Sequence, residues 1–542
     1  MKKALILIGT LAVIAAAVWF VKQQESQQSG HGRQNEHFVV ATETEIATLD
    51  PIKNLDPHII RIEAQIFEGL VGLDENNEIV PLIAQSWEPV GGFEKWRFKI
   101  RQGVKFHPSA IFGEARTRNV TAEDVVFSFN RIMGSGSSIG WIVDGVIKRQ
   151  PDPSGGDKAG PPAIKAISDS EIEIELTSPD PFFVHRLTST PLVIMPSELA
   201  SLPEGEFGVK TTIGTGPFSV KSRSDAEVVL EANPGHWRPR EGNISSLVFR
   251  VIKNDQIRLQ EIQNGQIQFA RVPSSMAEGV VKQVNGAYQT IGASSKLNAS
   301  AVDTFNVVVL GFNSDKMDRP LRQAINAGIR RTDLVKLIPQ NLALPASSIL
   351  PPAIPGVDTS KTPDPHSAEA AKQAFAASTS EIKNAPIEIL VHEKDASEDL
   401  GQLVQAQLQE VGIVTTLTKL DYNTVIGRMI SGEFSTFIMA FEFTFPAAPS
   451  ILEMNYNPEK IPVPNFWRYR NDTVTSLLKK FQTTNDKAEV GSLVDQIGAA
   501  TAEDPPAAFL INNKMLVLYT PNVTKVPING QSIPLFWKVK MQ

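Results

Sequence analysis

The sequence contains no cysteine. This absence excludes disulfide bonds, thiolate metal sites, cysteine nucleophiles and a lipid-modified amino-terminal cysteine. Its eight histidines are scattered, with no pair at metal-ligand spacing, and no long basic run occurs. Since the net charge is also −7, we expect no metal, no cofactor and no nucleic-acid partner.

The composition is that of an ordinary soluble protein, with 42% hydrophobic and 20% charged residues. A chain of 542 residues is long enough for two or three compact units.

The amino terminus has the pattern of an export signal. Lys2 and Lys3 precede an uncharged apolar run over residues 4–21, and a polar stretch follows to Asn35. Cleavage after Ala17 would leave an apolar mature terminus, so an uncleaved membrane anchor is the alternative. The run reaches the low end of the roughly 17–25 residues that span a bilayer. In both cases we expect the folded part to lie outside the cytoplasm.

Beyond residue 36 the patterns predict mixed α and β structure. Residues 171–176 and 96–100 alternate polar and apolar side chains, as half-buried strands do. Thr121 can cap a helix, and Asp124 is the fourth residue counted from Thr121, which is typical of a capping box.

A strand, a helix and a second strand follow one another between residues 387 and 420. The strands are expected at 387–391 and 414–420, with helical apolar spacing between Leu400 and Val411. Two strands joined through a helix form a parallel pair, so this segment predicts an α/β sheet.

Catalytic motifs are matched only superficially, and we expect no enzyme. Ser138 lies in a G-x-S-x-G pattern at 136–140, but a helix precedes it where a nucleophile elbow needs a strand. Residues 392–396 begin like a zinc helix and lack the second histidine. The glycines of 214–219 precede strand-like residues, which argues against a dinucleotide site.

Nine short motifs carry a resemblance to a known family. They are Leu49-Asp50-Pro51, Pro81–Glu88, Arg101–His107, Thr121–Phe127, Ile213–Phe218, Asn233–Trp237, Phe312-Asn313, Leu321–Asn326 and Ala502–Pro506. In this order they resemble the extracytoplasmic solute-binding proteins of family 5, the oligopeptide- and dipeptide-binding proteins of ABC importers. The resemblance covers about residues 38–542.

The resemblance implies a two-lobed periplasmic-binding-protein fold of the α/β class, with an enlarged first lobe and a ligand cleft between the lobes. It places the signal or anchor with its tether at 1–35, lobe 1 at 38–272, lobe 2 at 273–504 and a return to lobe 1 at 505–542. An extra subdomain of lobe 1 is expected around 143–170. The lobes would close around the solute.

Residues 440–444 match the family segment G-W-x-x-D, whose backbone pairs with the peptide and whose aspartate holds its α-ammonium group. Here that aspartate is replaced by Thr444, which cannot neutralise an ammonium. Glu442 lies on the same strand face and could supply the carboxylate, or could be a charge at the rim. Asp56 is a second candidate, or a turn residue before Pro57.

Four further ligand contacts follow from position alone. Tyr422 and Trp141 match places where relatives have pocket aromatics, Arg428 could meet an acidic group of the ligand, and Phe441 matches the family tryptophan. Packing or surface exposure is the alternative for each. We expect a cleft lined by Phe441, Glu442 and Tyr422.

The leading prediction is a periplasmic, monomeric solute receptor that binds a peptide or peptide-like ligand and delivers it to an ABC permease in the inner membrane. Because Thr444 replaces the aspartate, a blocked or cyclic peptide, an opine, an oligosaccharide and a haem-like compound are alternative ligands. A membrane-anchored sensor or scaffold on the same fold is the alternative. An intact amino terminus would favour it, and a cut near Ala17 would oppose it. A serine hydrolase using Ser138 is a remote third possibility.

Overall fold

The structure, a computed structural model, describes residues 37–152, 159–361, 364–392 and 397–542. The predicted export signal and most of the zinc-like motif at 392–396 lie outside the described residues. Within the described residues, no helix is both long and apolar enough to cross a membrane.

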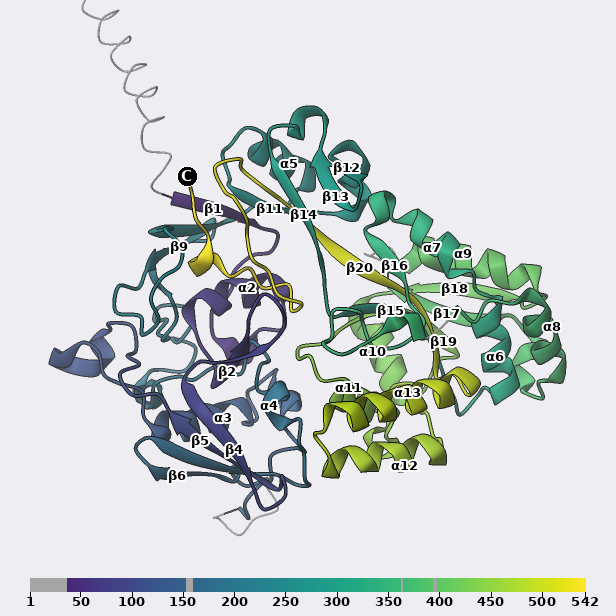
Figure 1. Ribbon diagram of the computed structural model, residues 1–542, viewed down its shortest axis with the longest axis horizontal. Helices are drawn as coiled ribbons and strands as arrows, with labels where there is room; N and C mark the ends of the chain where they lie inside the picture. The colour runs from purple at the N-terminus through teal and green to yellow at the C-terminus, as the bar shows by residue number, and fades with distance from the viewer. Residues whose placement is uncertain (1–36, 153–158, 362–363, 393–396) are drawn as a thin grey trace, which may run out of the picture.

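Two halves of the molecule share one 12-stranded sheet (Figure 1). Its main path runs β18-β17-β19-β15-β20-β11-β1-β10-β9-β8, with β14 and β16 also paired to β20. Its strands are β1 (His37–Thr42), β8 (Phe218–Arg223), β9 (Glu227–Ala232), β10 (Ser246–Val251), β11 (Phe269–Val272), β14 (Asn298–Asp303), β15 (Asn306–Phe312), β16 (Ala343–Pro345), β17 (Ile387–His392), β18 (Thr415–Leu420), β19 (Thr436–Glu442) and β20 (Ala507–Tyr519).

The long strand β20 connects the two halves. Its first part pairs antiparallel with β15 of the second lobe, from Ala507 to Ile511. Its last part pairs antiparallel with β11 of the first lobe, from Leu516 to Tyr519. The return of the chain to the first lobe therefore takes place within this strand.

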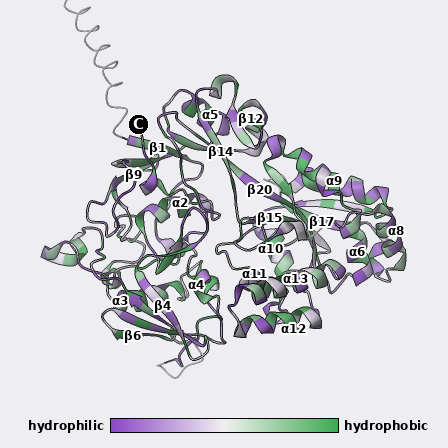
Figure 2. Ribbon diagram, in the orientation of Figure 1, coloured by the Kyte–Doolittle hydropathy of each residue, from purple (hydrophilic) through white to green (hydrophobic). Residues whose placement is uncertain are grey.

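The second lobe is a sheet covered by helices on both faces. β17 is parallel to β18 and to β19, so the predicted strand–helix–strand unit forms as a parallel pair. One face packs on α6 (Arg319–Gly328), α8 (Ala368–Ala377) and α9 (Ser397–Glu410). The other packs on α10 (Tyr422–Ser431), α11 (Ala448–Tyr456), α12 (Asp472–Lys480) and α13 (Lys487–Glu503). Polar and apolar residues alternate along the outer helices α9 and α12 (Figure 2).

The first lobe contains a second, antiparallel sheet of four strands, β4 (Ala84–Val90), β5 (Lys95–Ile100), β7 (Glu171–Glu175) and β6 (Ile164–Ser168). The predicted strands at 96–100 and 171–176 are thus confirmed. Helix α3 (Ala122–Ile132) begins at Thr121 with the predicted capping box.

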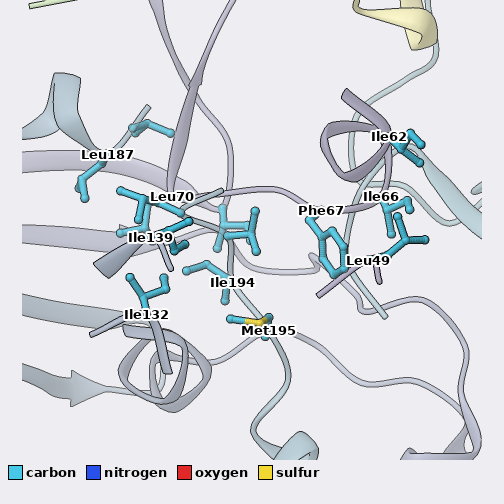
Figure 3. Close-up of a cluster of buried hydrophobic side chains, with 14 of the residues drawn as sticks. Leu49, Ile62, Ile66, Phe67, Leu70, Ile132, Ile139, Leu187, Ile194 and Met195 are labelled. Carbon is cyan, nitrogen blue, oxygen red and sulfur yellow. The ribbon is translucent and has the colours of Figure 1, made fainter. Parts of the chain in front are cut away.

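A buried apolar core joins this sheet to α2 (Pro57–Ile66), which leads into β2 (Val71–Leu73) and β3 (Ile79–Pro81). Figure 3 shows Ile62 and Ile66 of α2 beside Leu49 and Phe67, and Ile132 from the end of α3. This core fixes the orientation of α2.

Residues after β11 pack with the first-lobe strands. Ala277, Val281 and Leu297 share a core with Val39 of β1 and Val248 of β10. This segment contains β12 (Val281–Val284) and β13 (Ala287–Thr290), whereas α5 (Asp255–Gln263) precedes β11. The predicted lobe boundary at residue 272 therefore precedes a segment that packs on the first lobe.

Candidate ligand-binding cleft

The end of β19 carries the segment that matches the family's ligand-contacting strand. Ala440 and Glu442 are exposed, whereas Phe441 between them is half-buried. The ring centroid of Phe441 lies 5.2 Å from that of the fully buried Trp467 and 6.3 Å from that of Phe466. Phe441 thus packs on the second-lobe core, and the exposed face of the strand end is that of Glu442.

Tyr422 lies at the same edge of the sheet. The parallel strands β17, β18 and β19 end at His392, Leu420 and Glu442, and Tyr422 opens the helix after β18. Tyr422 is 55% exposed, and its ring contacts the His392 ring edge-on at a centroid distance of 5.9 Å. The carboxyl edge of parallel strands is where α/β proteins commonly bind ligands.

Thr444, at the position of the family aspartate, connects the lobes. The Ser189 hydroxyl of the first lobe donates a hydrogen bond to the Thr444 hydroxyl at 3.0 Å. The side-chain amide of Gln531 donates to the Thr444 carbonyl and, at 2.9 Å, to the carbonyl of Thr188. Thr444 therefore joins the lobes directly, which leaves Glu442 as the exposed carboxylate on this strand.

The first turn of α2 belongs to the first lobe, and His58 and Arg61 line a small pocket with Glu43 and Arg271. Asp56 caps the helix, because its carboxylate accepts a hydrogen bond from the His58 backbone N–H at 2.8 Å. One turn later, Arg61 is only 9% exposed. Its Nε donates to the Ser532 carbonyl at 3.0 Å, and its Nη1 lies 3.2 Å from His58 Nδ1.

Glu43 is the carboxylate at the centre of a basic cluster beside Arg61. It contacts His58 Nδ1 and forms ion pairs with Arg258 at 3.6 Å and with Arg271 at 3.7 Å. Burial, followed by repulsion from the neighbouring arginines, lowers the pKa of His58 to about 3. Neutral His58 carries one ring proton, so its Nδ1 either donates to Glu43 or accepts from Arg61, but does not do both.

Two adjacent residues of the carboxy-terminal segment, Gln531 and Ser532, contact different lobes. Gln531 binds Thr444 of the second lobe, and Ser532 accepts the hydrogen bond from Arg61 of the first. Burial lowers the pKa of Arg61 to about 9, while Glu43, Glu442 and Asp56 act against that shift. Among the described residues, no ion pair joins Glu442 to Arg61.

Arg428 and Trp141 lie in other surroundings. The Arg428 guanidinium pairs with Glu388 at 3.1 and 2.7 Å, and its Nε donates to the Glu433 carbonyl at 2.7 Å. The Arg428 guanidinium is therefore held by Glu388 and Glu433 of its own lobe, and Arg428 is not part of the proposed site. Trp141 is 51% exposed in a 3-10 turn, Gly140–Ile142, of the first lobe.

Arg61 and His58 were not anticipated from the sequence. The sequence pattern that could have predicted them is a row of polar residues at 58, 61 and 65, which recur at helical spacing. This row adjoins the apolar row of Ile59, Ile62 and Ile66 on the same helix. A charged residue so close to the buried side of an amphipathic helix indicates a specific partner.

The geometry around Ser138 is that of a loop. Ser138 follows α3, and its backbone N–H donates to the Ile52 carbonyl at 2.8 Å. A helix thus precedes the serine, as the sequence predicted. Among the described residues, no group of three or more His, Asp or Glu could hold a metal ion.

The fold and the cleft define a two-lobed solute-binding protein. A family model described as "Bacterial extracellular solute-binding proteins, family 5 Middle" matches residues 78–462. The chain belongs to this family, whose members are solute-binding proteins.

Relatives with similar sequences and structures span most of the chain. A "Probable di/tripeptide-binding protein 5" from Pseudomonas aeruginosa is 28% identical over 67% of this chain and 68% of its own. The DppA protein from Helicobacter pylori, solved in complex with the peptide STSA, has a TM-score of 0.74 at 21% identity and covers 93% of this chain and 98% of its own. HbpA2 from Haemophilus parasuis has a TM-score of 0.78 at 20% identity, covering 93% and 100%.

Proposed function

We propose that this protein is the extracytoplasmic receptor of an ABC importer and that it binds a peptide with a free amino terminus between its two lobes. Closure of the lobes around the peptide would create the form that an inner-membrane ABC permease accepts. A receptor of this kind performs no chemistry on its solute.

The observation that carries the proposal is the exposed carboxylate of Glu442 at the carboxyl end of β19, the edge of the sheet where Tyr422 also lies. A carboxylate there can bind a peptide ammonium two residues before the position that the resemblance assigns to the family's aspartate, although β19 ends at Glu442 and Thr444 lies in a bend beyond it. The named relatives support the peptide class, since one is called a di/tripeptide-binding protein and another was solved with a peptide.

Native mass spectrometry of the freshly purified protein tests this function. We expect a retained mass equal to one peptide, which is released on denaturation and identified by fragmentation. A retained solute that contains no amino acid would contradict the peptide class.

A further inference from the structure

A pocket of about 290 Å³ lies in the first lobe. It is lined by the end of α2, by β2, by residues 188–190 and by residues within the carboxy-terminal segment 529–538, among others. No described residue between 273 and 504 lines it, so Glu442 and Tyr422 of the proposed peptide site have no part in it. Small-molecule sites begin at roughly 300 Å³, so the pocket has the size of a site for a small solute.

The guanidinium of Arg238 contacts two indole rings at this pocket. Its carbon Cζ is 4.8 Å from the ring centroid of Trp237 and 4.4 Å from that of Trp537. Arg101 lies over Trp237 at 4.1 Å, and Lys538 lies over Trp537 at 5.1 Å. Three cations therefore adjoin two indoles, and Arg238, which contacts both rings, is held in place by cation–π contacts rather than by hydrogen bonds.

The donors of Arg238 lack acceptors. Among the described residues, none accepts a hydrogen bond from this guanidinium, and its buried Nε has no partner. Glu68 forms only a long ion pair with it, at 3.7 Å. The Glu68 carboxylate instead accepts hydrogen bonds from Thr215 at 2.9 Å and from the Trp237 indole at 3.1 Å. A guanidinium carries five N–H donors, so Arg238 can bind an incoming anion without giving up a protein acceptor.

The rest of the lining decides which anion suits the pocket. Phe67, Val71 and Ile533 supply a buried apolar wall. Two more carboxylates line the pocket nearer to solvent, those of the exposed Glu241 and the half-buried Asp74. These carboxylates repel a second negative charge, so a monoanion with an apolar body fits better than a phosphate dianion.

We propose that this pocket binds a small monocarboxylic acid with an apolar body, whose carboxylate is held by Arg238, and that the acid acts as an effector of lobe closure. Ser189 and Gln531 line the pocket and also donate hydrogen bonds to Thr444 of the second lobe. An acid packed against these two side chains restricts their motion and thereby stabilises their contact with Thr444. The inference goes beyond the proposed function, because it requires no peptide.

Calorimetric titration of the full-length protein with isovalerate, isovaleramide and inorganic phosphate tests the site. We expect the acid to bind about 10-fold to 100-fold more tightly than the amide, the range for a charged hydrogen bond, and more tightly than phosphate. Arg238→Met should bind acid and amide equally. Arg97→Met, which removes an arginine from β5 of the same lobe, should retain the difference.

A second variant keeps the test decisive if Arg238→Met does not fold. Val80→Phe enlarges a half-buried side chain of the pocket lining and leaves Arg238 in place. We expect it to abolish binding of isovalerate. Equal binding of acid and amide to the wild type, or tighter binding of phosphate, would overturn the assignment of a carboxylic acid. Binding of isovalerate that survives Val80→Phe would overturn the pocket.

The effector role has its own test, because coupling between two sites is reciprocal. Thr444 does not line the pocket, yet it is the second-lobe partner of Ser189 and Gln531. Thr444→Val removes its hydroxyl and should weaken binding of isovalerate by about fivefold, the equivalent of one hydrogen bond. An unchanged affinity in Thr444→Val would overturn the effector role and leave the carboxylate site standing.

Discussion

The hydroxyl groups of Ser189 and Thr444 lie 3.0 Å apart, one on each lobe. They are 255 residues apart in the chain. Thr444, which the resemblance predicts at the position of the family's aspartate, thus forms a hydrogen bond between the lobes.

This hydrogen bond should favour the closed form. We expect Ser189→Ala to destabilise closure by about 1 kcal/mol, the usual net contribution of one hydrogen bond. Small-angle scattering of the unliganded variant should then give a larger radius of gyration than the wild type. The matched control is Ser222→Ala, at an exposed serine of β8. Identical scattering from all three proteins would contradict a role for Ser189 in closure.

Phe441 should contribute to stability rather than to affinity, because it packs on Trp467 and Phe466. We expect Phe441→Leu to lower the free energy of unfolding by about 1–2 kcal/mol and to leave peptide affinity within about twofold. Denaturant titration and calorimetry measure the two quantities separately. A large loss of affinity with unchanged stability would instead place Phe441 in the cleft, as its match to the family tryptophan predicts.

Glu63, on the buried side of α2, should make stability depend on pH. Burial, reinforced by the nearby Asp50, raises the pKa of Glu63 to about 8 against an opposing hydrogen bond from Asn54. Between the ordinary value of 4.5 and about 8, the folded state binds a proton that the unfolded state does not. The contribution of Glu63 to stability is therefore complete at low pH and is lost as the pH rises through this window.

Glu63→Gln removes this titration. Relative to the wild type, the variant should gain stability by up to about 1.4 kcal/mol per pH unit within the window. Urea midpoints at pH 5 and pH 8 measure the difference, with the exposed Glu78→Gln as control. A constant difference between variant and wild type across the two pH values would show that Glu63 does not titrate there.

The local elements of the fold could be predicted because their signals are local. The capping box at Thr121 and the strand–helix–strand pattern from 387 to 420 depend on neighbouring residues and on burial of one face. The path of β20 could not be predicted in the same way. Its partners β15 and β11 lie more than 190 residues earlier, and no periodicity encodes which strands a long buried strand will join.

The candidate site was predictable only in part, for the same reason. A strand pattern predicts that Glu442 and Thr444 share a face, whereas β19 ends at Glu442 and Thr444 lies in a bend, where it binds Ser189. A helical pattern predicts that Arg428 lies near the surface. It does not predict the partner of Arg428, which is Glu388 of β17, 40 residues earlier in the chain. Side-chain partners that are distant in sequence decide which polar residues remain free for a ligand.

The most direct test of the central claim compares tri-alanine with N-acetyl tri-alanine on the wild-type protein and on Glu442→Gln, by calorimetric titration. If Glu442 holds the peptide ammonium, acetylation should weaken wild-type binding by about 10-fold to 100-fold and should have no effect on the variant. Equal binding of both peptides to the wild type, or an unchanged penalty in Glu442→Gln, would contradict a peptide held by its amino terminus at this residue.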